Sequence, residues 1–274
     1  MKAMKEGSLT IVGSGITAIS HFTMEAALAI RLADVTFYIV ADALTEGWII
    51  DNARSCSSLA DLYVEGQHRA ATYEGMTRTI VEAVKAGNRV CAIFYGHPGV
   101  FVNPSHAAVR ELQIAGYPVS MQAGVSAEDC LFADLGFDPS TNGCLSMEAT
   151  NFLIYERHIE PSVALVLWQI GMVGDPTHNP RRTVRKLDCL VEKMLRYYPK
   201  DHHVCIYEAP IYNVSHPRRD WCHLELLPDK DVTGISTLYV PAFGKPQSDS
   251  YFISKLDLVV SDQRPVQFRE DLVS

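Results

Sequence analysis

The chain has 274 residues, 47% of them hydrophobic, and carries a formal net charge of −8 at pH 7. This length permits one large domain or two smaller ones with a sizeable core. The acidic balance argues against a nucleic-acid partner, because phosphate binding needs a basic face, and the lack of an eighteen-residue apolar run or signal-peptide segment argues against membrane insertion and export.

The seven cysteines are scattered and form no Cys-x-x-Cys pair. This usage is typical of a reducing cytoplasm, so we expect a cytoplasmic protein with neither structural zinc nor a disulfide framework. Two basic clusters, at residues 181–186 and 218–219, are interpreted as a solvated helix face and a loop. The sequence also lacks the motifs of zinc peptidases, P-loop nucleotidases and serine hydrolases.

The first part of the chain alternates strand and helix patterns. Strands are predicted at residues 9–12 and 35–40, with a helix at residues 23–33 between them. From residue 41 to residue 73 the periodicity is lost, which predicts a long loop of a kind that often carries function. A helix is predicted at residues 76–86.

A glycine turn, Gly13-Ser14-Gly15, follows the first strand. It fits a tight strand-to-helix turn better than a dinucleotide site, because Thr17 and Ala18 stand where a third glycine is wanted. Asp42 stands where a dinucleotide site would need its ribose-binding acid.

Two tyrosines and an arginine stand out in the predicted loop. Arg69 and Tyr73 are four residues apart and share a helix face if the following helix begins early. Tyr63 lies six residues before Arg69. On spacing alone, a surface arginine between two packing tyrosines is the favoured interpretation.

The stretch from residue 90 to residue 101 gives the clearest indication of a binding site. Residues 90–94 are apolar and predict a strand covered on both faces. They run into Tyr95-Gly96-His97-Pro98-Gly99, a turn whose glycines leave room for close approach of a ligand. A helix follows, with Ser105 as its expected N-cap, so the turn lies at the carboxyl end of a strand, where open α/β sheets bind ligands.

The second half repeats the α/β alternation. Ser126 is the expected N-cap of a helix that ends at Gly136, and Asp129 completes an approximate capping box. Strand ends at Gln169, Ala209 and Ser236 are expected to line one crevice. The remaining predicted elements are strands at 117–121, 144–147, 163–168, 204–207, 238–240 and 255–260, and a helix at 183–198.

These motifs resemble the tetrapyrrole methylase superfamily over residues 8–242. The resemblance rests on Gly13-Ser14-Gly15, the turn from Tyr95 to Phe101, and Gly124-Val-Ser-Ala-Glu128. It implies an α/β protein of two successive αβα domains, with a cofactor cleft between them. We predict an N-terminal domain at residues 1–122, a C-terminal domain at 123–245 and a tail at 246–274.

Within that superfamily, the order and spacing of Tyr63, Arg69, Tyr73 and Tyr95 resemble the active site of the borosin peptide backbone α-N-methyltransferases. This resemblance overrides the packing interpretation of the first three residues. A backbone amide nitrogen is a poor nucleophile, because its lone pair is delocalised into the carbonyl group. Arg69 would favour a phenolate and so make Tyr63 or Tyr73 a usable base, or it would steady the carbonyl oxygen of the peptide, while Tyr95 would orient the peptide and the cofactor.

The resemblance implies S-adenosylmethionine as the cofactor, with S-adenosylhomocysteine as the product, and a homodimeric enzyme. The cofactor contacts that it implies come from loops in both halves of the chain. They are Tyr95, His97, Val100, Asn103, Ser126, Ala127, Gln169, Ala209, Ser236 and Thr237.

Two departures from the family patterns shape the expected substrate. Several tetrapyrrole methylases carry an acidic residue soon after the first glycine turn, whereas this chain has Ile16-Thr17-Ala18-Ile19, which weakens a porphyrin-type substrate. Fused borosin enzymes continue into a core peptide, whereas this sequence ends at Ser274 with a charged tail. We therefore expect a split arrangement, in which the enzyme methylates a separate precursor peptide.

Three alternatives remain at this point. A corrin or porphyrinogen C-methyltransferase would share fold and cofactor, but the acidic balance disfavours a substrate rich in carboxylates. A ribosomal RNA methylase of the same superfamily lacks the basic face that it would need. A non-catalytic module that binds the cofactor or a peptide would keep the pocket without needing the tyrosines and the arginine.

Overall fold

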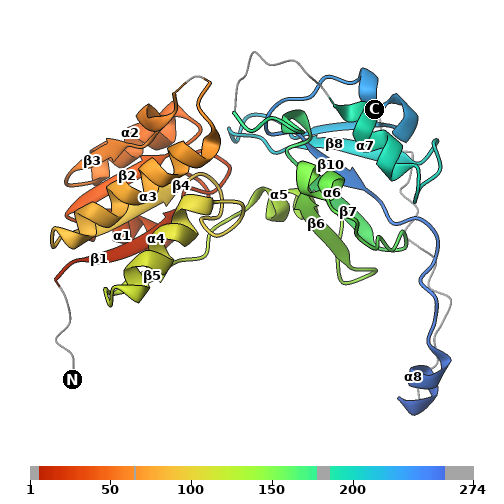
Figure 1. The fold of residues 1–274 in the computed structure, drawn as a ribbon, viewed down its shortest axis with the longest axis horizontal. Helices are drawn as coiled ribbons and strands as arrows, with labels where there is room; N and C mark the ends of the chain where they lie inside the picture. Colours follow the sequence, from red (N-terminus) through yellow and green to blue (C-terminus); the bar gives the residue numbers. More distant parts are fainter. Residues whose placement is uncertain (1–5, 65, 178–185, 257–274) are drawn as a thin grey trace. The chain divides into compact units, whose positions relative to one another are not determined.

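A computed structural model of the chain describes residues 6–64, 66–177 and 186–256. The chain forms two compact units (Figure 1). Unit 1 comprises residues 1–137, 174–184 and 207–219, and unit 2 comprises residues 138–173, 185–206 and 220–274. The predicted domain limits at residues 122 and 245 stay a prediction.

Unit 1 is built on a five-stranded sheet with the order β3-β2-β4-β1-β5. Each pair of neighbouring strands is parallel, which is the arrangement that the strand–helix alternation predicts. The strands are β1 (Ser8–Gly13), β2 (Val35–Ile39), β3 (Cys56–Ser58), β4 (Arg89–Phe94) and β5 (Val119–Met121).

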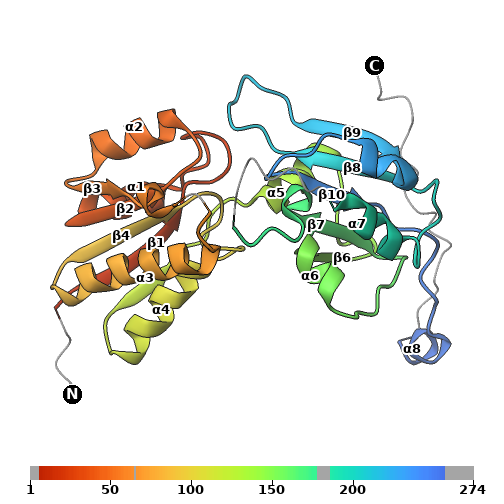
Figure 2. The same ribbon diagram turned by 45° about the horizontal axis from the view of Figure 1, so that its top comes forward.

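Helices cover both faces of this sheet. Figure 2 shows α1 (Met24–Leu32) and α2 (Ala43–Asn52) on one face, and α3 (Arg69–Lys85) and α4 (Asn103–Ile114) on the other. Successive residues of a strand point to opposite faces, so Ile11 packs into the core under α3 and α4 while Val12 packs into the core under α1 and α2. Unit 1 also contains η1 (Ala60–Leu62) and α5 (Ala127–Leu135).

Unit 2 is built around a second five-stranded sheet with the order β6-β7-β10-β8-β9. β7 pairs in parallel with β6 and antiparallel with β10, so this sheet is mixed. The strands are β6 (Cys144–Glu148), β7 (Ala164–Trp168), β8 (His203–Glu208), β9 (Arg218–His223) and β10 (Thr237–Val240). The last residues of β8 and the first of β9 belong to unit 1.

Two helices, α6 (Ala149–Ile154) and α7 (Leu187–Met194), pack into one core with β7, β8 and β10. Lys193 lies inside this core with 9% of its surface exposed. Its ammonium group donates to the carbonyl oxygens of Phe152 at 2.6 Å, Leu153 at 3.1 Å and Tyr155 at 2.7 Å. The lysine therefore closes the carboxyl end of α6, where free carbonyls and the helix dipole favour a cation. The other helical elements are η2 (Ile170–Met172), η3 (Leu224–Asp229) and α8 (Ser250–Lys255).

Most predicted elements are confirmed. The eight strands predicted between residues 9 and 240 lie within two residues of their expected bounds. α3 begins at Arg69, as the shared face of Arg69 and Tyr73 required. The capping box between Ser126 and Asp129 is also present. In the described ranges, no helix is long and apolar enough to cross a bilayer.

Other predictions were wrong. Residues 41–73 are not one loop, because Asp42 accepts a hydrogen bond from the Thr45 amide at 2.8 Å and caps α2, and β3 and η1 follow. Ser105 lies inside α4, not at its N-cap, and its hydroxyl donates to the Pro98 and Val102 carbonyls. Arg218 and Arg219 begin β9 and do not lie in a loop.

The sequence patterns also missed α6, and the predicted strand at 255–260 is contradicted where it is described, because α8 extends to Lys255. Residues 257–260 lie outside the described residues. The start of the predicted helix at 183–198 and most of the basic cluster at 181–186 also lie outside the described residues. The described part of that helix, α7, ends at Met194 and not at residue 198.

Candidate functional site

Three glycine-bearing turns meet at the carboxyl ends of β1, β4 and β5. Gly15 and Gly96 exchange two backbone hydrogen bonds, of 3.2 and 3.0 Å. A side chain on Gly13 would place its Cβ 2.1 Å from the Gly96 carbonyl oxygen, and one on Gly124 would lie 3.5 Å from the same atom. The first turn therefore needs glycine at residue 13, whereas a Cβ on Gly124 would make only an ordinary contact. Unit 1 thus brings together the three motifs on which the resemblance rests.

His21 supports the first of these turns. Its Nδ1 atom accepts hydrogen bonds from the backbone amides of Ile16 at 3.3 Å and Thr17 at 3.1 Å. Burial lowers the pKa of His21, while Asp129 and Asp134 act in the opposite direction. The neutral imidazole therefore holds the turn. No sequence pattern indicated this role, although His21 lies only four residues after Thr17.

Tyr95 is the half-buried residue that follows β4. Burial raises the pKa of its phenol to about 12, and Cys130 and Asp42 act in the same direction. Its hydroxyl makes no hydrogen bond within the described ranges. Tyr95 is therefore a protonated phenol with its hydrogen-bonding capacity still available to a ligand.

The other predicted residues of this turn differ in exposure. His97 uses its Nδ1 atom to accept a hydrogen bond from the Gly99 amide at 2.9 Å, which fixes its ring. Val100 is 37% exposed, and Asn103 is the exposed first residue of α4. The turn thus presents one fixed imidazole, one apolar group and one amide.

Ser126 and Ala127 lie at the start of α5. The Ser126 hydroxyl donates to the Asp129 carboxylate at 2.7 Å and accepts from the Asp129 amide at 3.2 Å. The Ser126 amide donates to the same carboxylate at 2.6 Å. Ser126 is therefore occupied in shaping the helix start, and Ala127 follows it as the first helical residue.

Ala209 lies beside the first glycine turn, within unit 1. The carbonyl of Pro210 accepts a hydrogen bond from the Thr17 hydroxyl at 3.2 Å. The carbonyl of Ile211 accepts one from the Ala18 amide at 2.7 Å. The strand end at Ala209 is therefore tied to residues 13–21, although more than 180 residues separate them in sequence.

Tyr63, Arg69 and Tyr73 come together at the start of α3. Arg69 and Tyr73 lie one turn apart on the helix, and both lie close enough to Tyr63 to influence the pKa of its phenol. The Arg69 guanidinium also donates to the carbonyl of Asp175, and its amide donates to the carbonyl of Pro176 at 3.0 Å.

The pKa of Tyr63 differs from the expectation that Arg69 would favour a phenolate. Burial raises the pKa of Tyr63 to about 12, with Tyr73 acting in the same direction. Arg69 lowers the pKa of Tyr63, as expected for a cation, but its effect is outweighed. In this state of the protein Tyr63 is a protonated hydrogen-bond donor.

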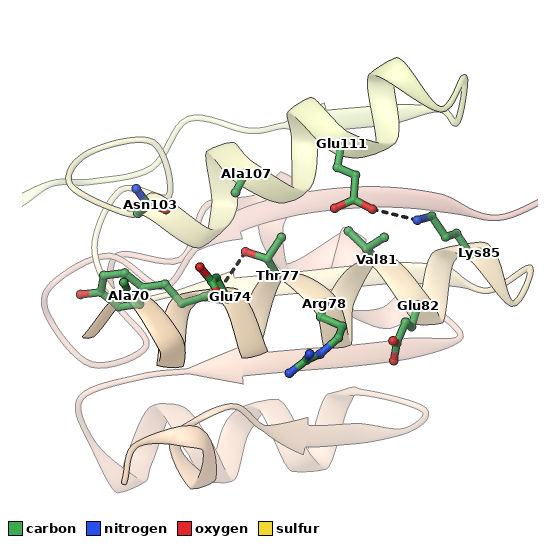
Figure 3. Close-up of a pocket in the computed structure, with 11 residues that line it drawn as sticks. Ala70, Glu74, Thr77, Arg78, Val81, Glu82, Lys85, Asn103, Ala107 and Glu111 are labelled. Atoms are coloured by element: carbon green, nitrogen blue, oxygen red, sulfur yellow. Dashed lines mark hydrogen bonds and ion pairs between the residues drawn. The ribbon is translucent and has the colours of Figure 1, made fainter. Parts of the chain in front are cut away.

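A groove of about 540 Å³ runs between α3 and α4, and Tyr73 and Asn103 both line it. Figure 3 shows Asn103 at one end and the ion pair of Lys85 with Glu111, 2.8 Å long, at the other. The groove therefore links one predicted catalytic residue with one predicted cofactor contact along the surface of unit 1.

The predicted contacts in unit 2 form a second group. Gln169 has a left-handed backbone with φ of 58°, and the Ile170 amide after it donates to the Ser236 carbonyl at 3.0 Å. The hydroxyl of buried Ser236 accepts from the Thr233 amide at 2.7 Å, and Thr237 is buried as well. Gln169, Ser236 and Thr237 thus gather in unit 2, while a crevice shared with Ala209 stays a prediction.

Comparison with known proteins gives a consistent result. Residues 8–209 match the family model of the tetrapyrrole (corrin/porphyrin) methylases. Over 245 residues the chain is 42% identical to a methyltransferase and ribosomally synthesized type I borosin cyclic peptide precursor of Coprinopsis marcescibilis, which covers 86% of this chain and 62% of that protein. The corresponding omphalotin A precursor of Omphalotus olearius is 40% identical over 266 residues, or 95% of this chain and 64% of that protein. The chain thus spans less than two thirds of the length of these relatives.

Solved structures share the fold at low sequence identity. The uroporphyrin-III C-methyltransferase of Thermus thermophilus matches with a TM-score of 0.63 and 17% identity, over 86% of this chain and 92% of that one. A structure of that enzyme complexed with S-adenosyl homocysteine matches with a TM-score of 0.57 and 17% identity, over the same shares of both chains. Since the family model covers most of the chain and the fold agrees, this protein belongs to the tetrapyrrole (corrin/porphyrin) methylase family.

Proposed function

We propose that this protein is an S-adenosylmethionine-dependent methyltransferase that methylates backbone amide nitrogens of a ribosomally made peptide. The observation that carries the proposal is the grouping of Tyr63 and Tyr73 beside Arg69, in a unit with the tetrapyrrole methylase fold. The relatives of about 40% identity, which are named as methyltransferases and ribosomally synthesized cyclic peptide precursors, support a peptide substrate.

The predicted cofactor contacts fit the chemistry of S-adenosylmethionine. The cofactor offers an amino acid end, ribose hydroxyls and an adenine ring, so it needs both polar and apolar neighbours. The Tyr95 hydroxyl and the side-chain amides of Asn103 and Gln169 make no hydrogen bond in the described part of the chain. Val100 and Ala127 supply apolar surface. When bound, the cofactor supplies a methyl group on a positively charged sulfur.

The tyrosines and the arginine act on the peptide amide. The nitrogen must lose its proton as it gains the methyl group, and negative charge then develops on the adjoining carbonyl oxygen. Tyr73, in its phenolate form, is proposed to accept the amide proton and become a neutral phenol. Tyr63 is proposed to donate a hydrogen bond to it, because the raised pKa of Tyr63 keeps that phenol protonated. Arg69 is proposed to stabilise the charge on the carbonyl oxygen.

A precursor that is a separate protein and a homodimeric enzyme stay predictions within this proposal. One experiment tests the chemistry and the arrangement together. The enzyme is co-expressed with a small protein encoded beside it, and the intact masses of both chains are measured and then fragmented to locate methyl groups.

The outcomes of this experiment are distinct. Methyl groups on backbone nitrogens of the small protein, absent with Arg69→Ala, support the peptide methyltransferase and the separate precursor. Methyl groups on the enzyme's own chain would support the chemistry and contradict a separate precursor. If both chains are unmodified while the enzyme binds S-adenosylhomocysteine, a tetrapyrrole or other small-molecule acceptor becomes the better proposal, in line with the shared fold.

A further inference from the structure

A tyrosine and an aspartate form a buried pair in unit 1 that the proposed chemistry does not use. Tyr207, near the end of β8, is only 1% exposed. Its hydroxyl donates to the Asp134 carboxylate at 2.6 Å. Burial strongly raises the pKa of Tyr207, and Asp134 acts in the same direction. Tyr207 therefore stays protonated at any physiological pH and is a permanent donor in a charge-assisted bond.

This bond joins two segments that carry predicted cofactor contacts. Asp134 lies in the last turn of α5, which has Ser126 as its N-cap and Ala127 as its first residue. Tyr207 lies two residues before Ala209. Because α5 is one continuous helix of nine residues, a bond at its far end constrains where its near end lies. Arg219 adds a second link, because its guanidinium donates to the Asp134 carbonyl at 3.2 Å.

Ala209 is held from both sides. Before it, Tyr207 is bonded to α5; after it, Pro210 and Ile211 are bonded to the first glycine turn through Thr17 and Ala18. Tyr95 lies near the same pair, since its phenol contributes to the raised pKa of Tyr207. The pair therefore lies next to three segments that carry predicted cofactor contacts, namely the start of α5, Ala209 and Tyr95. Neither Tyr207 nor Asp134 is itself a predicted contact.

We propose that Tyr207 and Asp134 are positioning residues for the methyl donor, which hold the Ala209 strand end in register with the start of α5 and so set the affinity for the cofactor. This inference rests on the proposed function in that it takes S-adenosylmethionine as the ligand. Neither side chain touches the reacting atoms, and both act through the segments that they join.

The test is cofactor affinity in matched variants. Tyr207→Phe keeps the ring and removes only the hydroxyl, which leaves the Asp134 carboxylate without its short bond. We expect S-adenosylhomocysteine to bind about tenfold more weakly by isothermal titration calorimetry. The KM for S-adenosylmethionine should rise by a similar factor, with kcat at saturating cofactor within about twofold of the original value. Asp134→Asn keeps an oxygen acceptor, so it should lose less than about threefold.

Tyr198→Phe is the matched control. Tyr198 is 3% exposed, and its buried hydroxyl has no hydrogen-bond partner among the described residues. Removing that hydroxyl should leave cofactor affinity unchanged. The comparison separates the loss of one specific bond from the loss of any buried hydroxyl.

The results divide clearly. Binding by Tyr207→Phe equal to the original protein would overturn the inference. If Tyr207→Phe gives no cooperative thermal melt, Asp134→Ala and Asp134→Asn take its place. Weak binding of S-adenosylhomocysteine by the alanine variant, with recovery by the asparagine variant, supports the inference. Equal binding by both variants overturns it. Binding is measured without a peptide, so an enzyme that binds the cofactor but methylates no peptide would fail the proposed function and leave this test intact.

Discussion

The start of α3 and the end of α6 each hold a cation against backbone carbonyls, and they use it differently. Lys193 donates all three of its ammonium protons to carbonyls around the end of α6. The Arg69 guanidinium, which has five N–H donors, makes a single side-chain hydrogen bond within the described residues, to Asp175. A saturated buried cation stabilises the fold, whereas a cation with spare donors beside two tyrosines is equipped to bind something else.

Replacing Arg69 should give the largest effect. With Arg69→Ala we expect kcat for peptide methylation to fall about thousandfold, because a charge-stabilising donor is lost at the reacting amide. The fold should persist, with a melting temperature close to that of the original protein. Arg110→Ala, an exposed arginine on α4, serves as the control and should methylate normally. Retention of activity by Arg69→Ala would show that spare donors do not mark the site.

Replacing Lys193 should produce the opposite pattern. Lys193→Met fits an apolar core but leaves three carbonyls without donors, so we expect a loss of about 3 kcal/mol in the free energy of unfolding, measured in urea. Methylation per folded molecule should be unchanged. Lys200→Met, which removes an exposed ion pair with Glu225 at 3.6 Å, should cost less than about 0.5 kcal/mol. Equal losses for the two variants would contradict a structural role for Lys193.

Replacing each of the two tyrosines next to Arg69 should lower activity to a different extent. Tyr73→Phe should lower kcat about hundredfold, because it removes the proposed proton acceptor. Tyr63→Phe should have a smaller effect, since the pKa of about 12 keeps the Tyr63 phenol protonated and makes it a poor base. Rates are compared at saturating peptide and cofactor. A larger loss with Tyr63→Phe would reverse the assignment.

A pH effect should be the smallest of these changes. Burial lowers the pKa of His21 below its usual 6.5, so the neutral form is favoured in the folded protein. The stability that follows is fully present above pH 6.5 and is lost as the pH falls through the lower folded-state pKa. We therefore expect a lower melting temperature at pH 5.5 than at pH 7.5, with a smaller difference in His21→Gln. His202, whose pKa burial also lowers, should account for part of what remains.

The sequence predicted those features that depend on local patterns. β4 and the turn after it were readable because an apolar run leads directly into glycines and a proline, and α5 because Ser126 and Asp129 stand three residues apart. α2 was missed, since its apolar residues do not form a clean stripe, although Asp42 three residues before Thr45 was a usable capping signal. β9 was missed because its exposed residues alternate with few apolar ones.

The residues of the candidate site were proposed only through resemblance to a family. Spacing alone favoured a packing role for Tyr63 and Tyr73, and it gave no information on contacts between distant residues. Arg69 contacts Asp175, 106 residues away, and Tyr207 contacts Asp134, 73 residues away. Such pairs depend on how the strands are ordered in space, which a single sequence does not reveal.

The division of the chain into units also bears on how the protein is made. Unit 1 takes in residues 174–184 and 207–219 as well as residues 1–137. The partners of Arg69 at Asp175 and Pro176, and those of Thr17 and Ala18 at Pro210 and Ile211, therefore leave the ribosome long after the sheet to which they attach. At about 5–20 residues per second, the interval between residue 137 and residue 219 lasts several seconds. During synthesis the start of α3 therefore lacks these partners until about a third of unit 2 has been translated, and the first glycine turn lacks its partners until about half of unit 2 has been translated.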